Sequence, residues 1–469
     1  MQAHNYIEAM KKILFTLVLA LITLVSCDDV SKADKLRLEN KFEEAAELYQ
    51  KAADEGNAYA KWRLSEAYAN GDGVDFDDQE ALRLLKEAAE EGCEEAQCDL
   101  AFAYMFDWYG VGQDEEKGNK MMESLVKKSN NVYVLCRYAG LLFFGEGGYE
   151  ENKSKAVSIL GKINDKGDAR YLWTMALVYA NGTDEIEIDE NEYVEYIKKA
   201  YDKEPRLVAE DMARIYHYGY GDTKQDLNKM VECYQEGIKA NSVICMTDLA
   251  EIYLSKDSIL KDFHNPRKAV ELYKKATKHG SGKAYAYLGN LYYFGEEIIK
   301  DDEKAFECWT KAVELRSPEG MFSLGFAYLE GRGCEKDIKK GIETWKSAVD
   351  YGSGAAANNL YCYYYTGDFG GKKNIELAKK YLIKAAQLND EVACRNIAQH
   401  YYNGSDLVEK DQGQSFIYAK KAADLGDVDA CSLLAYFYKN GIGCIKNPQK
   451  AKEYEDKTKA KEESENKKE

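Results

Sequence analysis

Proline is scarce in this chain, which has only 4 prolines among its 469 residues. Proline lacks the backbone N–H that an inner helical position needs, so its scarcity favours long helical stretches. Long apolar runs are also missing after residue 27, where no segment approaches the roughly 20 apolar residues that span a bilayer. We therefore expect a helical chain with no transmembrane domain in its mature part.

Positive charge is in deficit. Lysine and arginine together number 64 against 82 aspartates and glutamates, which gives a formal net charge of −18. Such an acidic protein should repel nucleic acid, so we expect no nucleic-acid partner. The length exceeds what one compact core usually holds, which leaves several globular domains or one elongated repeat array.

Residues that carry common catalytic chemistry are few. None of the 5 histidines stands at ligand spacing from cysteine or carboxylate, and phosphate-binding, dinucleotide-binding, zincin and CxxC motifs are absent. Ser124–Lys127 and Ser258–Lys261 have the Ser-x-x-Lys spacing, but a lysine-rich chain produces such pairs by chance and no Lys-Thr-Gly motif follows. We expect a non-catalytic protein without a metal site or cofactor.

The N-terminus has the pattern of a bacterial export signal. Lys11 and Lys12 precede Ile13–Val25, which is apolar apart from two threonines. Leu24–Cys27 then resembles a lipobox, at which bacterial lipoproteins are cut before a lipid-carrying cysteine. We interpret residues 1–27 as a lipoprotein signal that ends at Cys27, the expected lipidation site and membrane anchor.

This signal predicts a bacterial membrane-anchored lipoprotein, either periplasmic or surface-exposed. Asp28 and Asp29 follow the cysteine, where acidic residues affect sorting differently between bacterial lineages. An uncleaved helical anchor is the alternative, and translation could start at Met1 or Met10.

A tyrosine recurs every 36 to 39 residues, and ten of eleven such positions are Tyr. We call these the anchor positions: Tyr68, Tyr104, Leu142, Tyr179, Tyr216, Tyr253, Tyr292, Tyr328, Tyr364, Tyr401 and Tyr438. The residue four places earlier is always bulky and the residue three places earlier is small in ten repeats, with Tyr361 as the exception. These residues share one helical face, and the small one should let a neighbouring helix approach closely.

A second helix is expected in each repeat. Glycine follows most anchors by three residues and suits a helix C-cap, as in Asn70-Gly71. A short loop leads to an Asp/Asn-rich start such as Asp77–Ala81, and a further glycine such as Gly92 closes the second helix. One such pair cannot bury its apolar face alone, so neighbours must stack. We expect a tether at 28–40, a solenoid at 41–454 and a charged C-terminal tail at 455–469.

These residues resemble the Sel-1-like repeat family, a relative of the tetratricopeptide repeats. The resemblance is strongest in Leu324–Gly333 and its continuation Lys346–Gly352, and it covers nearly everything from Phe42 to about Tyr454. Repeats two to six depart from the pattern in loop length and glycine content. The resemblance implies an all-α fold, a right-handed α–α superhelix of about eleven two-helix repeats. It also implies a concave face that docks proteins or peptides.

Aromatic residues are the candidate partner-binding residues. Tyr293, Tyr365 and Tyr402 share one repeat position and should line up along the solenoid, with Phe294 and Tyr363 beside them. One helical face cannot bury a whole aromatic run, so some rings should line a groove. Packing between repeats is the alternative role for these rings.

Eleven cysteines remain besides Cys27, and an odd number excludes complete intramolecular pairing. A cysteine-rich exported branch of the family bridges a late second-helix cysteine to another eight residues on. Cys394 and Cys431 match the later member, but Ala386 and Ala423 stand at the earlier one. We expect structural thiols, with disulfides as the alternative that export would permit.

The sequence thus predicts a lipid-anchored scaffold or adaptor of the bacterial cell envelope. The alternative, similar to the cysteine-rich exported branch, is a protein that binds or hydrolyses cell-wall or β-lactam-like molecules. A cytosolic signalling adaptor would fit the fold but conflicts with Leu24–Cys27.

Overall fold

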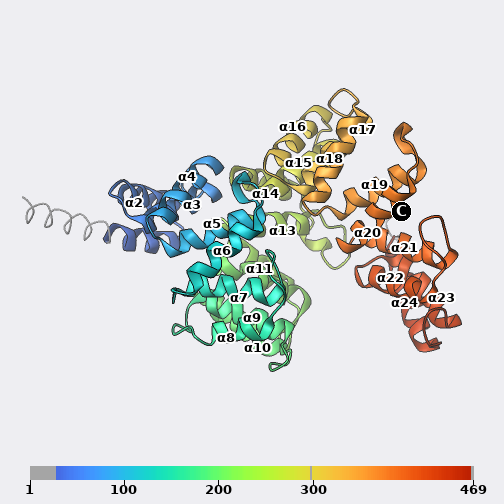
Figure 1. The fold of residues 1–469 in the computed structure, drawn as a ribbon, viewed down its shortest axis with the longest axis horizontal. Helices are drawn as coiled ribbons and strands as arrows, with labels where there is room; N and C mark the ends of the chain where they lie inside the picture. Colours follow the sequence, from blue (N-terminus) through green and yellow to red (C-terminus); the bar gives the residue numbers. More distant parts are fainter. Residues whose placement is uncertain (1–27, 296–297, 466–469) are drawn as a thin grey trace, which may run out of the picture. The chain divides into compact units, whose positions relative to one another are not determined.

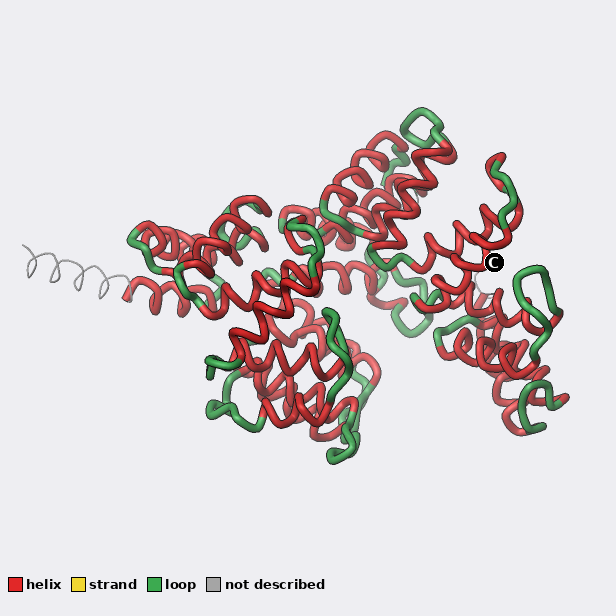
Figure 2. Tube along the Cα trace, in the orientation of Figure 1, coloured by secondary structure: helices red, strands yellow, loops and turns green. Residues whose placement is uncertain are grey.

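The computed structural model describes residues 28–295 and 298–465, and these consist of helices and loops without strands (Figure 2). The predicted signal and Cys27 lie outside the described residues. Residues 28–38 are helical, and within them Ala33 and Leu36 are buried. No described helix is both long and apolar enough to cross a bilayer.

Eleven helices carry the anchor positions and are the first helices of the repeats (Figure 1). They are α3 (Ala58–Asn70), α5 (Glu94–Phe106), α7 (Val132–Phe144), α9 (Ala169–Asn181), α11 (Pro205–Tyr218), α13 (Val243–Leu254), α15 (Gly282–Phe294), α17 (Pro318–Glu330), α19 (Gly354–Thr366), α21 (Glu391–Asn403) and α23 (Val428–Asn440). First helices of successive repeats contact one another, for example α15 and α17 or α7 and α9.

The second helices pack against them in alternation. They are α2 (Phe42–Asp54), α4 (Asp78–Glu90), α6 (Glu115–Val126), α8 (Lys153–Leu160), α10 (Glu190–Lys203), α12 (Leu227–Lys239), α14 (Pro266–Lys278), α16 (Asp302–Glu314), α18 (Ile338–Asp350), α20 (Ile375–Gln387), α22 (Gln412–Asp424) and α24 (Pro448–Glu465). Three short 3₁₀ turns lie in the loops: η1 (Trp108–Gly110), η2 (Lys261–Phe263) and η3 (Asp368–Gly370). The all-α fold of stacked helix pairs is as predicted.

The described chain forms two compact units. The first unit runs to Glu251 and includes Lys278–Gly280, and the second unit comprises Ile252–Thr277 and the residues from Ser281 onwards. The division falls inside the repeat of α13 and α14, one of the repeats whose sequence departs from the pattern.

The second helices from α4 onwards begin in the same way. An aspartate or asparagine side chain caps its N-terminus, as Asp337 Oδ1 does by accepting from Lys340 N at 2.9 Å. The backbone N–H of this residue donates to the carbonyl of the anchor, as from Asp337 to Tyr328 at 2.8 Å. The same backbone bond recurs in all eleven described repeats, so it fixes the turn between the two helices.

The anchor ring also holds the two helices of one repeat together. In six described repeats a lysine of the second helix lies over it, as Lys117 does over Tyr104 at 3.6 Å and Lys340 over Tyr328 at 4.3 Å. In four described repeats a tyrosine of the second helix stacks on the ring, as Tyr381 does on Tyr364 at 5.7 Å, and one of these four rings, Tyr438, also has the lysine. Contacts inside the repeat therefore account for nine of the ten anchor tyrosines, all except Tyr68.

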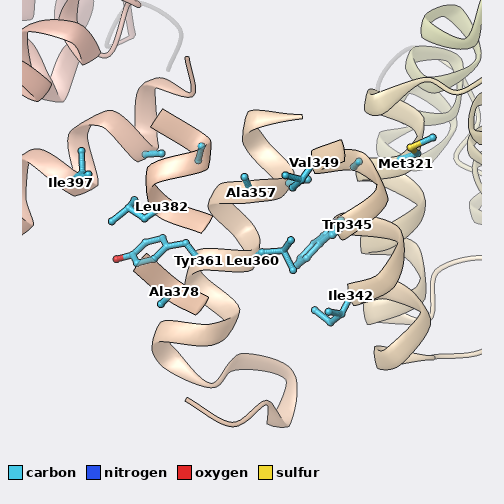
Figure 3. Packing of buried hydrophobic residues seen from close by; sticks show 14 of the residues in the cluster. Met321, Ile342, Trp345, Val349, Ala357, Leu360, Tyr361, Ala378, Leu382 and Ile397 are labelled. Carbon is cyan, nitrogen blue, oxygen red and sulfur yellow. The ribbon is translucent and has the colours of Figure 1, made fainter. Parts of the chain in front are cut away.

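The predicted small position lies where the first helix meets its second helix. Ala101, Ala250 and Ala398 are fully buried there. Gly289 and Gly325 take this position where the second helix carries a tryptophan. A Cβ on Gly325 would lie 2.4 Å from Cδ1 of Trp345, and one on Gly289 2.6 Å from Nε1 of Trp309. Trp345 and Leu360 belong to one buried cluster that joins neighbouring repeats (Figure 3).

Left-handed residues end most helices, as the glycine pattern predicts. Gly71, Gly331 and Gly441 have φ between 63° and 73°. Where glycine is missing, other residues adopt the same conformation: Asp107 ends α5 with φ 54°, and Asn389 follows α20 with φ 60°. Helix ends are thus preserved in repeats that lack the glycine.

The second loop glycine joins consecutive repeats. A Cβ on Gly333 would lie 2.1 Å from the carbonyl oxygen of Asp302, at the start of the preceding second helix. Gly443 approaches Gln412 O in the same way, at 1.9 Å from an added Cβ. The two glycines of the loop therefore have different roles. The first ends the helix, and the second allows close contact with the previous repeat.

The contact between Gly325 and Trp345 can be tested by a double-mutant cycle. In a free helix, Gly→Ala stabilises by about 1 kcal/mol. Here we expect Gly325→Ala to lower the free energy of unfolding by about 1–3 kcal/mol, because the methyl group overlaps the indole. In a Trp345→Leu background the same change should be neutral or stabilising, as measured by urea titration. A stabilising Gly325→Ala in the wild-type chain would contradict this account.

Candidate binding surfaces

The three predicted ladder tyrosines occupy equivalent junctions in the second unit. Tyr293, Tyr365 and Tyr402 are half-buried at or near the ends of α15, α19 and α21. Each ring meets an aromatic ring of the next first helix: Tyr293 lies 6.4 Å from Phe326, Tyr365 lies 5.4 Å from His400, and Tyr402 lies 6.4 Å from Tyr436. The rings thus pack between repeats and keep part of their surface exposed.

The series is interrupted at α17. Leu329 stands at the equivalent position there and is fully buried. Phe294, beside Tyr293, is 65% exposed. Tyr363 belongs to a different contact, because its ring lies against Gly371 in the loop after η3. The five predicted residues therefore form separate aromatic patches, and their part in partner binding stays a prediction.

Tyr361 links two repeats through its hydroxyl group. Its ring, the bulky exception at the small position, lies beside Ala378 and Leu382 of α20 (Figure 3). The Tyr361 hydroxyl is 2.8 Å from Nε2 of His400 on α21. Burial lowers the pKa of His400 below its ordinary value of 6.5. The neutral imidazole is therefore the form that this junction favours.

In the first unit, charged residues occupy the repeat position five places before the anchor. Arg63, Asp99 and Arg137 stand there in α3, α5 and α7. Asp99 is buried and accepts from Trp62 Nε1 at 2.8 Å, from the Tyr133 hydroxyl at 2.6 Å and from Arg137 Nη2 at 3.4 Å. Burial raises the pKa of the Asp99 carboxyl, although Arg137 opposes the rise. Asp99 thus connects three consecutive repeats.

Distant repeats of the first unit also meet. Asp72, in the loop after α3, pairs with Arg206 at 2.5 Å and accepts from Asn241 Nδ2 at 3.2 Å. Arg37 pairs with Glu204 at 3.1 Å. These residues are 134 to 169 positions apart in sequence. The first repeat therefore touches the fifth and sixth, and the stack of the first unit closes on itself.

Two adjoining cavities lie inside this closed stack. One has a volume of about 260 Å³ and the other about 430 Å³. Both are lined by Arg37, Arg63, Arg170 and Glu204. We call the two together the arginine chamber. Arg206, Glu66 and Asp72 line only the smaller cavity, and Tyr59, Trp62 and Tyr133 line only the larger one.

This chamber was not predicted from the sequence. The chain has 11 arginines among its 64 basic residues, and four of the eleven line the chamber while Arg137 lies beside it on Asp99. Arginine is rare here, so the arginines within residues 37–206 are the signal in the sequence from which a charged cavity could have been predicted. Closure of the stack could not be seen in the repeat pattern.

The eleven cysteines after Cys27 are free thiols in the structure. Seven are buried, and burial raises the pKa of Cys93, Cys136 and Cys245 to about 12. Such thiols stay protonated and unreactive at neutral pH. Cys334 and Cys444, in the loops after α17 and α23, are half-buried.

The serines and histidines considered as catalytic or metal-binding candidates do not form a common site in the described residues. Ser124 and Ser258 are both exposed. His264 lies in a loop with Nδ1 3.1 Å from Ser255 O, and Nδ1 of His279 is 2.8 Å from Asn70 O. Among residues 28–295 and 298–465, no group of three or more His, Cys, Asp or Glu is placed to hold a metal ion.

Comparison with known proteins identifies the repeats. A family model described as the Sel1 repeat matches residues 38–57, 58–93, 94–130, 132–168, 209–242, 243–281, 282–317, 318–350, 355–390, 392–427 and 428–454. These segments make up more than half of the chain. Residues 169–208 lie between two matched segments, and there α9 and α10 keep the anchor Tyr179 and the capping Asp189.

Three similar proteins put this match in context. A negative regulator of exopolysaccharide production from Rhizobium leguminosarum bv. viciae is 43% identical over 60 residues, which are 13% of this chain and 22% of the regulator. The chain thus spans about a fifth of the length of this curated relative. A Sel1 repeat protein from Oxalobacter formigenes is 24% identical and covers 54% of this chain and 99% of its own, with a TM-score of 0.42. A protective antigen of uropathogenic Escherichia coli is 22% identical over 88% of this chain and 86% of its own, with a TM-score of 0.38.

The Tyr361–His400 junction predicts a pH dependence. Because the folded state lowers the pKa of His400, its neutral form contributes stability that is present above about pH 6.5 and is lost as the pH falls through the lowered pKa. We expect the melting temperature of the chain to fall between about pH 7 and pH 5, and His400→Gln to flatten part of that fall. His264→Gln, in an exposed loop, is the control. An unchanged slope in His400→Gln would contradict the assignment.

Proposed function

The chain belongs to the Sel1 repeat family, whose members commonly mediate protein–protein interaction, and on that basis we propose that it is a non-catalytic scaffold. It holds partner proteins or peptides along the face that its first helices form. The proposed anchor is lipid on Cys27, which places the scaffold at a bacterial membrane, on its periplasmic or outer surface.

The observation that carries the proposal is the repeated aromatic junction of the second unit. Tyr293, Tyr365 and Tyr402 lie at equivalent places on first helices and remain partly exposed. Phe294 and Tyr436 beside them are 65% and 48% exposed. Rings held rigidly by a neighbour lose little entropy on binding, and tyrosine is enriched at interfaces because it offers both an apolar face and a hydroxyl group.

The proposal does not extend to hydrolysis of cell-wall or β-lactam-like molecules, because no specific observation favours that alternative. Ser124 and Ser258 are exposed, and neither lines the arginine chamber.

Site-specific photocrosslinking in intact cells tests the docking face. A benzophenone side chain is placed at Phe294, on first helix α15, and in a second variant at Ile417, on second helix α22. The two positions are 65% and 56% exposed, so they are matched in accessibility. We expect discrete protein adducts at Phe294 and none at Ile417.

Loss of an exposed ring should weaken the same adducts. Tyr436→Ser removes a ring that is 48% exposed, so the fold should tolerate it better than truncation of the half-buried Tyr402. We expect fewer adducts from Phe294, because a partner docked along several repeats loses its contact with the Tyr436 ring. Equal labelling at Phe294 and Ile417, or none at either, would contradict docking along the first helices.

Metabolic labelling tests the lipid anchor. Radioactive palmitate should enter the wild-type chain and a Cys431→Ala control, and should be lost in Cys27→Ala. Mass spectrometry of the wild-type protein should give a mature chain that begins at Cys27. A wild-type chain that keeps residues 1–26 and carries no lipid would refute the lipoprotein assignment.

A further inference from the structure

The N-terminal helix, residues 28–38, is part of the folded body of the first unit. Ala33 is fully buried and Leu36 nearly so, and both belong to an apolar cluster that contains Tyr49 of α2. The Tyr49 hydroxyl also donates to Asp34 at 2.6 Å. A helix that buries its side chains in a core cannot swing away without losing that burial. The helix is therefore fixed in place against α2.

Ion pairs hold the same helix near both of its ends. Near its start, Asp29 pairs with Lys51 in the last turns of α2 at 2.7 Å. Near its end, Arg37 pairs with Glu204, the residue directly before α11, at 3.1 Å. The N-terminal helix is thus joined to the first repeat and to the fifth repeat of the closed stack, so it belongs to the first unit as a whole.

A single peptide bond separates this helix from the residue proposed to carry the lipid. Cys27 is followed by Asp28, which is the first described residue and already helical. One residue spans at most about 3.6 Å, whereas an extended linker of about ten residues would span about 35 Å. A lipid on Cys27 would therefore keep the first turn of the helix at the level of the lipid headgroups.

The charge of this segment suits a position beside headgroups. Residues 28–41 contain four Asp or Glu and four Lys or Arg, so their net charge is zero, whereas the formal net charge of the chain is −18. Lys32 and Lys35 of the N-terminal helix are exposed. Anionic membrane surfaces attract basic side chains and repel acidic ones. The segment therefore avoids the repulsion that an acidic surface would meet there.

We call the side chains of Asp28, Asp29, Lys32 and Lys51 the N-terminal edge of the first unit. We propose that this edge lies against the headgroups of the bilayer that holds the lipid, because the folded body starts one residue after the lipidated cysteine. This placement rests on the lipid anchor proposed above and goes beyond it. A lipoprotein with a flexible linker would leave its folded part free to move away from the membrane.

Quenching by headgroup nitroxides tests the placement. The lipidated protein is purified from membranes and reconstituted in phosphatidylcholine vesicles that contain a lipid with a nitroxide on its headgroup. A fluorescent amino acid replaces Lys51 or, in the control, Lys199 of α10. The two lysines are matched, because their side chains are 54% and 52% exposed and each pairs with a carboxylate, at 2.7 and 2.6 Å.

The two labels lie in different parts of the first unit, because α2 and α10 are well separated within it (Figure 1). A nitroxide quenches only fluorophores that come close to it. We therefore expect quenching at Lys51 to be at least about three-fold stronger than at Lys199.

An inserted linker tests whether the short connection causes the contact. Asp-Asp followed by five Gly-Ser pairs is inserted between Cys27 and Asp28, so that two aspartates still follow the cysteine. Such a flexible segment has an average end-to-end distance of about 20 Å. We expect quenching at Lys51 to fall to the level of Lys199, while the protein still floats with the vesicles.

The results also separate this placement from the lipid anchor itself. A protein that floats with the vesicles but is quenched equally at Lys51 and Lys199, or at neither, would overturn the placement alone. Quenching at Lys51 that the linker leaves unchanged would also overturn it, because the short connection would then not be its cause. A protein that carries no lipid and does not float would overturn the lipid anchor and the placement together.

Discussion

In ten of the eleven repeats the contact between the first and second helix passes through one small residue, and the stack depends on it. At Ala101, Ala250 and Ala398 the methyl group is fully buried, and at Gly325 even a methyl group would overlap the indole of Trp345. A helix pair of this length has no other means of covering its apolar face than its partner and its neighbours. The distance set at this position therefore fixes how closely successive pairs can stack.

The period of the anchor tyrosine was sufficient to predict the helix pairs, their order and most of their ends. That prediction works because helix caps and small contact positions are local and recur in every repeat. The sequence did not reveal why the anchor is tyrosine. The reason is its second-helix partner, either a lysine such as Lys340 or a tyrosine such as Tyr381, which lies beyond a loop of variable length.

The candidate sites were harder to predict than the fold. Repeat position placed Tyr293, Tyr365 and Tyr402 at equivalent junctions, but it could not tell how much of each ring the next repeat covers. The chamber around Arg170 was hidden for a different reason. Its lining residues come from the first five repeats, and they meet only because the stack of the first unit closes through Asp72, Arg206 and Asn241.

Closure of the first unit has a consequence for how the chain is made. Asp72 accepts a hydrogen bond from Asn241, which is 169 residues further on. The carbonyl of Asn70 contacts His279, which is 209 residues further on. Joining such distant residues costs loop-closure entropy, and this cost arises before the contacts between them can stabilise the fold. During synthesis the early repeats emerge long before these partners, so their inner face stays uncovered until most of the first 280 residues have left the ribosome. A chaperone that binds the growing chain therefore meets an open stack of helices, and the enclosed chamber exists only in the finished protein.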